Sequence, residues 1–338
     1  MVAFAFDVRG QPLAVRLLEG ALAEDRLASA YLFAGPEGIG KRRLAEALGA
    51  VLLCGQVPAC GACPACHKLA AGTHPDRIEI RLPEDKKEIP VAEIRALQAR
   101  MPYAPHEGKR RVVLLFEAEN LSIAAANALL KTLEEPPART HLVLTTSSPH
   151  ALLPTVRSRC QVVRFAPLAT PDLQAICVAH GASPDAAAVA AAIAHGSASR
   201  AIAAAAEDEL AAERARAESF DRAASTGTLP DCVAAAAEIA RDKGRYLPPA
   251  LELLRAFYRD VLVVREGLGP DLMNLPDRHE QATAAARALP AEAILARLAA
   301  LSEASDRLDK NASPELVAEW VALRFREARA PRRAEGRS

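Results

Sequence analysis

The sequence of 338 residues is poor in aromatic side chains, in cysteine and in net charge. Phe, Trp and Tyr make up only 4% of it, and its seven cysteines are too few for a small protein held together by disulfides. Basic and acidic residues number 42 each, so any contact with nucleic acid would need a local basic patch. The sequence lacks both a run of roughly 18 apolar residues, as in a membrane helix, and an apolar N-terminal leader. We therefore expect a cytoplasmic protein with no membrane partner.

The rest of the composition is that of a folded globular protein, with 51% hydrophobic and 25% charged residues. In the first half, short apolar runs alternate with helical patterns. Runs that are apolar on both faces are typical of buried parallel strands covered by helices. We therefore predict an α/β domain over residues 1–166, with strands at residues 31–34, 78–80, 112–116, 142–145 and 162–165.

After Pro167 the sequence becomes rich in alanine and loses its strand signal. Gly196 and Ser197 interrupt the helical pattern, and turn-forming residues at 225–230 interrupt it again. The second half is therefore predicted to be all-α. We expect it to contain a small helical domain at 167–208, a larger helical domain at 209–328 and a disordered basic tail at 329–338.

The last helix has a clear beginning at Ser313 and Pro314, because serine caps helix N-termini and proline fits the first helical position. Apolar residues at helical spacing follow, which predicts that the helix presents one apolar face. That face consists of Leu316, Val317, Trp320 and Leu323.

Residues 31–41 predict a strand that enters a glycine-rich turn and then a helix. Gly35, Gly40 and Lys41 have the spacing G-x-x-x-x-G-K, and Gly38 lies between them. In such a loop the backbone N–H groups surround a phosphate at a helix N-terminus, and the lysine reaches the terminal phosphates. These four residues are therefore candidates for nucleotide binding.

Two residues that a P-loop ATPase needs for magnesium are replaced. The residue after Lys41 should carry a hydroxyl, and here it is Arg42; the buried strand at 112–116 should end in Asp, and here it ends in Phe116. Glu117 is all that is left of the acidic pair. We therefore predict that the chain does not hydrolyse ATP, while nucleotide binding without hydrolysis stays open because the glycines and Lys41 persist.

Four of the seven cysteines crowd together, with turn-forming glycines and prolines between them. Their C-x-x-C steps suit a structural Zn²⁺ held by four thiolates, a closed site with no open catalytic position. A redox pair, an iron–sulfur cluster, or His67 or His74 in place of one cysteine are the alternatives. The candidate ligands are Cys54, Cys60, Cys63 and Cys66, and the isolated Cys160, Cys177 and Cys232 are expected to be buried as small apolar residues.

Residues 124–137, AAANALLKTLEEPP, and the later VRSRC at 156–160 resemble bacterial clamp-loader subunits of the AAA+ superfamily. The likeness extends to the phosphate loop, to the four-cysteine insertion after the first helix and to Gly196 and Arg200 at the spacing G-x-x-x-R. This resemblance implies a RecA-like parallel sheet domain with a zinc insertion, a small helical lid and a C-terminal helical collar.

The resemblance also implies a function in DNA replication. Such subunits form a ring of five, here with tau or gamma and delta subunits, which loads the sliding clamp onto primed DNA for DNA polymerase III. The relatives that hydrolyse ATP carry the hydroxyl and the Asp that Arg42 and Phe116 replace here. The chain therefore looks like a non-catalytic, stator-type member of the ring. By resemblance, Arg159 would be an arginine finger in a neighbour's ATP site, Thr146 or Ser147 would sense the γ-phosphate, and Arg200 would be the lid arginine that contacts nucleotide.

Other interpretations stay open at this point. The chain could be an active clamp-loader ATPase that tolerates Arg42 and Phe116, or a zinc-dependent DNA-binding protein with a vestigial P-loop. Arg159, Arg200, Asn127 and Lys131 each have an ordinary structural interpretation as well. The basic run at 109–111 is expected to be a solvated turn rather than a DNA contact.

Overall fold

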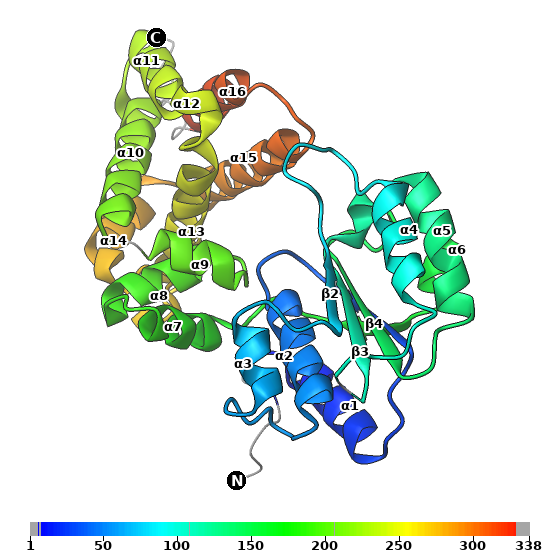
Figure 1. Cartoon of the computed structure of the whole chain (residues 1–338). Coiled ribbons are helices and arrows are strands. Elements are labelled where there is room, and N and C mark those ends of the chain that lie inside the picture. Colours follow the sequence, from blue (N-terminus) through cyan, green and yellow to red (C-terminus); the bar gives the residue numbers. More distant parts are fainter. Residues whose placement is uncertain (1–5, 7, 108, 206, 329–338) are drawn as a thin grey trace, which may run out of the picture. The chain divides into compact units, whose positions relative to one another are not determined.

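The computed structural model describes residues 6, 8–107, 109–205 and 207–328 (Figure 1). It divides into two compact units. The first unit runs to Asp172 and includes Gly196–Ser199, and the second comprises Leu173–His195 and the chain from Arg200 onward. The predicted division of the helical half near residue 208 stays a prediction, and the predicted tail lies outside the described residues.

The first unit contains a parallel five-stranded sheet with the strand order β2-β3-β4-β1-β5 (Figure 1). All five strands occur where the apolar runs predicted them, so the α/β class is confirmed. The strands in the middle of this order have no exposed residue, whereas β5 lies at the edge and exposes three of its four residues. The strands are β1 (Ala30–Ala34), β2 (Arg77–Ile80), β3 (Arg111–Leu115), β4 (Thr140–Thr146) and β5 (Gln161–Arg164).

Helices cover both faces of this sheet. On one face, side chains of the first two helices pack on alternate strand residues such as Phe33, Leu114 and Val143. On the other face, the fourth and fifth helices pack on the intervening residues, such as Leu32 and Val113. The three layers follow from the alternation of side chains along a strand. The helices of this unit are α1 (Pro12–Ala23), α2 (Lys41–Cys54), α3 (Pro64–Ala70), α4 (Val91–Arg100), a short 3₁₀ turn (Ala118–Asn120), α5 (Ile123–Glu134) and α6 (Pro154–Arg157).

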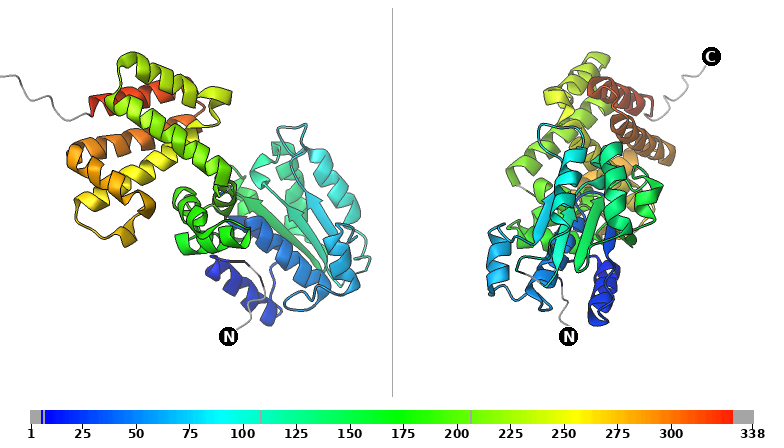
Figure 2. Two further views of the ribbon diagram at one scale, coloured as in Figure 1. Left: turned by 90° about the vertical axis from the view of Figure 1, so that its left-hand side faces the viewer. Right: turned by 45° about the vertical axis from the view of Figure 1, so that its right-hand side comes forward.

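All regular structure in the described part of the second unit is helical, as the alanine-rich sequence predicted (Figure 2). The hydrophobic core of this unit surrounds α13. Arg297 of α15 is buried in this core and stacks on the rings of Tyr258 and Phe325. The helices of this half are α7 (Thr170–Ala179), α8 (Pro184–Ile193), α9 (Ala198–Ala204), α10 (Glu207–Thr226), α11 (Leu229–Ile239), α12 (Arg241–Gly244), α13 (Leu247–Arg265), 3₁₀ turns at Pro270–Leu272 and Pro276–Arg278, α14 (His279–Ala288), α15 (Ala291–Asp309) and α16 (Pro314–Glu327).

Helix α16 begins as predicted, with Ser313 at the N-cap position and Pro314 as the first helical residue, although the hydroxyl of Ser313 accepts no capping hydrogen bond from the described backbone. The prediction for its apolar face needs correction. That face is divided: Val317 is buried, whereas Leu316 is 66% exposed and Leu323 43% exposed. The buried face instead consists of Val317, Ala318, Val321, Ala322 and Phe325, because small alanines allow α16 to pack closely on its neighbours.

The basic run at 109–111 also differs from the solvated turn that we expected. Arg111 is the first residue of β3 and is buried, and its guanidinium donates hydrogen bonds to the carbonyls of Tyr103 and Ala104. Arg110 forms an ion pair with Asp25. Two of the three basic residues, Arg110 and Arg111, therefore bind other residues of the first unit.

No described helix combines the length and the apolar character that crossing a membrane requires.

Candidate functional site

The phosphate loop connects β1 to the N-terminus of α2. Gly40 occupies the N-cap position of α2 with φ +98°, a left-handed conformation that glycine adopts without strain. The N–H of Gly35 donates to the carbonyl of Thr146, 3.2 Å away. β4 lies next to β1 in the sheet. Together with the hydrogen bond from Gly35, this pairing holds the end of β4 beside the loop.

Lys41 points back into its own loop. Its side chain is buried, and its ammonium donates hydrogen bonds to the carbonyls of Gly35 and Pro36. Burial lowers the pKa of this ammonium below its usual value, while the carboxylates of Glu119, Glu37 and Glu117 act in the opposite direction. The lysine thus holds the loop together from within.

A segment far along the chain closes the tip of the loop. The carbonyl of Gly38 accepts hydrogen bonds from the N–H groups of Ala198, at 2.7 Å, and Ser199, at 3.3 Å. Gly38 has φ +71°, a left-handed conformation that favours glycine, and a Cβ atom there would lie 2.0 Å from the hydroxyl oxygen of Ser199. The helix break predicted at Gly196 was one hint of this contact. Arg200, the next residue, belongs to the second unit, and its predicted contact with nucleotide stays a prediction.

The two positions where magnesium ligands are replaced lie against each other. The guanidinium carbon of Arg42 is 4.9 Å from the centroid of the Phe116 ring, and that of Arg81 is 5.4 Å from it. Phe116 is buried, and the Nε of Arg42 forms an ion pair with Glu46 at 2.9 Å. An aromatic ring in contact with guanidinium groups supplies no ligand for a divalent cation.

Beyond the end of β4, Ser147 holds a carboxylate that the sequence did not single out. Its N–H and its hydroxyl both donate to Oε1 of Glu119, at 2.8 Å and 2.5 Å. Burial alone would raise the pKa of the Glu119 carboxyl, but these hydrogen bonds outweigh it and lower the pKa below its usual value. The preceding Thr146 is fully buried, and its hydroxyl oxygen accepts a hydrogen bond from the N–H of Ser148.

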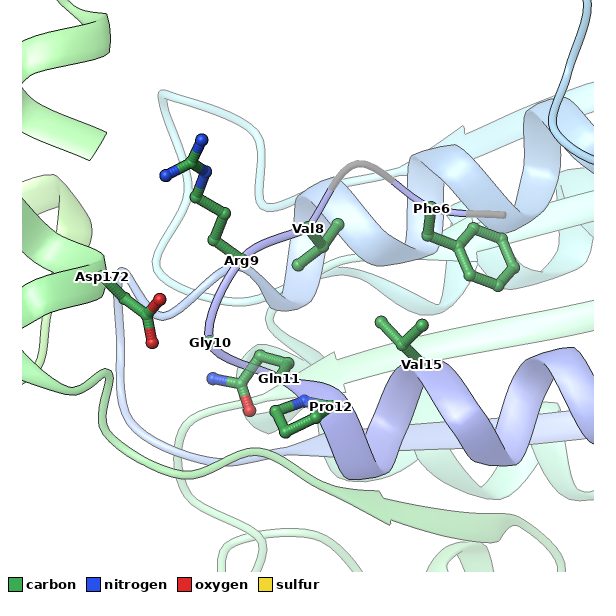
Figure 3. Close-up of a pocket in the computed structure, with 8 residues that line it drawn as sticks. All are labelled: Phe6, Val8, Arg9, Gly10, Gln11, Pro12, Val15 and Asp172. Atoms are coloured by element: carbon green, nitrogen blue, oxygen red, sulfur yellow. The ribbon is translucent and has the colours of Figure 1, made fainter. Parts of the chain in front are cut away.

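A cavity of about 510 Å³ lies beside the N-terminal segment of the first unit (Figure 3). The side-chain amide of Gln11 connects this segment to the loop, because it donates to the carbonyls of Ile39, at 3.2 Å, and Ala166, at 2.7 Å. The cavity has mainly apolar walls and two charged groups, those of Arg9 and Asp172. It is lined by Phe6, Val8, Arg9, Gly10, Gln11, Pro12, Val15 and Asp172.

The two motifs that carry the family resemblance contact each other. Arg159 follows the short helix α6, and its Nη2 lies 2.7 Å from Oε1 of Glu134, the last residue of α5. Its Nη1 donates to the carbonyl of Thr155 at 3.0 Å. Its side chain is 35% exposed, so its guanidinium lies at the surface. Asn127 and Lys131 are exposed on the same helix as Glu134.

The four clustered cysteines converge on one point. Their Sγ atoms all lie within 4.8 Å of one another, with separations of 3.6, 3.7 and 3.9 Å between three of the pairs. Sulfur ligands about 2.3 Å from a tetrahedral Zn²⁺ are about 3.8 Å apart, so the four thiols fit a metal ion. The cluster that could hold a metal consists of Cys54, Cys60, Cys63 and Cys66.

Helix ends place these thiols. Cys54 is the last residue of α2, which Gly55 terminates in a left-handed conformation. Cys63 caps α3, where its sulfur accepts a hydrogen bond from the N–H of Cys66. His74 is buried apart from the cluster, with its Nδ1 accepting from the N–H of Asp76. The isolated Cys160, Cys177 and Cys232 are buried, as predicted.

Comparison with known proteins finds a family that matches the first half of the chain. Residues 10–169 match the family described as DNA polymerase III, delta subunit. The match covers slightly less than half of the 338 residues. The delta-family segment, as we call residues 10–169, contains the phosphate loop, the cysteine cluster and the pair formed by Glu134 and Arg159.

Individual relatives each match less than half of the chain. The delta-prime subunit of DNA polymerase III from Pseudomonas aeruginosa is 48% identical over 137 residues, which are 39% of this chain and 42% of that protein. The tau subunit from Bacillus subtilis is 38% identical over 158 residues, 46% of this chain and 28% of that protein. The chain thus spans less than half the length of either relative. A gamma-subunit-related protein of known structure from Thermotoga maritima aligns with 92% of this chain and 99% of its own, at 17% identity and a TM-score of 0.44.

Proposed function

We propose that this chain is a delta-prime-type subunit of a bacterial clamp loader. In this role it completes a ring of five with tau or gamma and delta subunits, and the complex loads the sliding clamp onto primed DNA during replication by DNA polymerase III. The chain is a non-catalytic subunit of that assembly and acts in the cytoplasm. The delta-family segment and its delta-prime relative support this assignment.

The contact between Arg42 and Phe116 is the observation that favours a non-hydrolysing subunit. Similarity alone does not separate delta-prime from tau, because relatives of both names match this chain. A P-loop ATPase holds Mg²⁺ with a hydroxyl and a carboxylate, and here a guanidinium stacked on a ring stands in their place. Without those ligands the chain cannot arrange magnesium for its own reaction.

The phosphate loop itself supports the same assignment. The ammonium of Lys41 and the carbonyl of Gly38 already have partners within the first unit, which supports a structural role for the loop. The nucleotide-binding residues inferred from the sequence would then be the remains of an ancestral nucleotide site. These residues are Gly35, Gly38, Gly40, Lys41, Thr146 and Arg200.

Arg159 is the residue through which the subunit would act on a neighbour. A guanidinium is always charged and its fork of N–H groups matches phosphate oxygens, so an exposed arginine can stabilise charge that develops in an adjacent ATP site. Arg159 reaches the surface, as a finger acting in trans must.

We further propose that the metal in the cysteine cluster is Zn²⁺ in a purely structural role. Four thiolates close the tetrahedral shell, so water and substrate have no access to the ion. The ion would connect the end of α2 to the beginning of α3.

Reconstitution tests this function. Mixed with the other clamp-loader subunits of its host, the purified chain should form a stable complex with DNA-dependent ATP turnover. Arg159→Ala should leave assembly intact. It should abolish most of the ATP turnover at the neighbouring ATP site that Arg159 completes, since an arginine finger raises turnover at such a site by about 10³–10⁵. Arg95→Ala, which removes an exposed arginine on α4, is the matched control.

Two outcomes would contradict the proposal. Unchanged turnover of the Arg159→Ala complex would eliminate the finger. Magnesium-dependent hydrolysis by the purified chain alone, lost on Lys41→Ala, would establish an active ATPase of the tau type instead.

A further inference from the structure

We propose that Glu134 is a positioning residue for the guanidinium of Arg159, an inference that rests on the finger role proposed for Arg159. The two residues come from different motifs, since Glu134 ends α5 and Arg159 follows α6. Their ion pair, with 2.7 Å between Nη2 and Oε1, joins those motifs at the surface. The carboxylate therefore determines where the end of this long side chain lies.

A second anchor holds the other terminal nitrogen of Arg159. Nη1 donates to the carbonyl of Thr155 at 3.0 Å and lies 3.4 Å from the hydroxyl oxygen of Ser158. A guanidinium has five N–H groups in one plane. These bonds fix that plane and leave the Nε–H and one hydrogen of Nη2 to reach a phosphate.

The backbone under this pair is well restrained. The N–H of Glu135 donates to the carbonyl of Lys131 in the last turn of α5, which ends at Glu134. Arg159 lies in the short connection between α6 and β5, next to the buried Cys160, which directly precedes β5. Both partners of the ion pair therefore start from fixed positions.

The exposure of the pair excludes a large contribution to folding stability. The side chain of Arg159 is 35% exposed and that of Glu134 is 50% exposed, and ion pairs at such positions stabilise proteins very little. What the carboxylate can supply is orientation. Fixing one long, flexible side chain in advance corresponds to a roughly two- to tenfold gain when that side chain must act in one geometry.

Glu134→Gln in the reconstituted clamp loader tests this inference. The turnover number should fall roughly two- to tenfold, with the KM for ATP, subunit assembly and the melting temperature unchanged. Glu134→Asp, which keeps the charge, should recover part of the loss. Glu135→Gln is the matched control, because Glu135 is the adjacent exposed carboxylate and should leave turnover unaffected.

A double variant shows whether Glu134 acts through Arg159. The complex with both Arg159→Ala and Glu134→Gln should be no slower than the complex with Arg159→Ala alone. A further fall, or an equal fall with Glu135→Gln, would mean that Glu134 acts by another route. A higher turnover with Glu134→Gln would mean that the carboxylate restrains the finger, which also overturns the inference.

The same measurements separate this inference from the finger role. A slow Arg159→Ala complex beside an unaffected Glu134→Gln complex would overturn the positioning role alone. An Arg159→Ala complex with full turnover would overturn both.

Discussion

The guanidinium carbon of Arg42 lies 4.9 Å from the centroid of the Phe116 ring, so the two residues that replace magnesium ligands pack on each other. Arg42 comes from the first turn of α2 and Phe116 follows β3, and the fold brings them together at the phosphate loop. Phe116 stands where the sequence pattern of a P-loop ATPase has Asp, and the guanidinium of Arg42 lies over its ring. Because each side chain completes the surroundings of the other, we regard the two replacements as one structural unit.

This packing predicts unequal losses when each partner is truncated. Phe116→Ala removes a buried ring and should lower the free energy of unfolding by about 3–5 kcal/mol. Arg42→Ala removes an exposed cation over that ring and should cost only about 1 kcal/mol, because exposed cation–π contacts are weak. Denaturant titrations of the two variants give both values.

Phe116→Leu is the control for the ring, since it keeps the site apolar and removes the aromatic face. It should cost less than Phe116→Ala, and Arg42→Ala should cost almost nothing in this background. An equal effect of Arg42→Ala with Leu and with Phe at position 116 would mean that the arginine stabilises the protein without the ring.

The sequence was sufficient to predict the five strands and the cysteine cluster. Buried parallel strands are apolar on both faces, as residues 112–116 show, and local spacing alone predicts a four-thiolate site. The sequence also marked Arg42 and Phe116 as departures from an ATPase. It could not show that they touch, because that contact depends on where α2 and the end of β3 meet in three dimensions.

Other features depend on contacts between distant residues and left little trace in the sequence. The closure of the loop by Ala198 and Ser199 joins Gly38 to a segment some 160 residues later, and only the break at Gly196 hinted at it. In the sequence, nothing distinguishes Glu119 from other acidic residues that follow a strand. Only the structure shows that Ser147 donates hydrogen bonds to its carboxylate. The buried face of α16 differs from the predicted one because the core contacts Ala318 and Ala322, and the prediction considered only large apolar side chains.

Glu119 should make the stability of the first unit depend on pH. Its pKa is lowered in the folded state, so it stabilises the fold above its usual pKa of 4.5, and that contribution is lost as the pH falls through the lower folded value. Glu119→Gln should therefore reduce stability by about 1 kcal/mol at neutral pH. The unfolding free energy of wild type and variant should converge in acid, as measured by denaturant titration across that range.

Ser147→Ala is a second probe of the same interaction, because it removes one of the two hydrogen bonds to Glu119 and keeps the carboxylate. At neutral pH, Ser147→Ala should lower the free energy of unfolding by less than Glu119→Gln does. Glu135→Gln, at an exposed position, should follow the wild-type profile. A difference between wild type and Glu119→Gln that stays constant down to strongly acidic pH would contradict the role of the carboxylate charge.

Metal removal should unfold the cysteine module. A structural zinc ion contributes about 10 kcal/mol or more to small modules of this kind, and the loop between α2 and α3 has few apolar residues to replace it. We expect one zinc per chain by elemental analysis. After chelation, amide hydrogen exchange should accelerate at residues 55–70 and the melting temperature should fall.

Cys63→Ser should reproduce the effect of chelation, because it removes one thiolate and the cap of α3 together. Cys177→Ser, at a buried cysteine outside the cluster, should retain the zinc whatever its effect on stability. Since Cys54 ends the same helix that begins at Lys41, exchange at the first turn of α2 shows how far the loss propagates toward the phosphate loop. Wild-type protein stripped of metal with an unaltered melting curve and exchange pattern would refute a structural metal at this site.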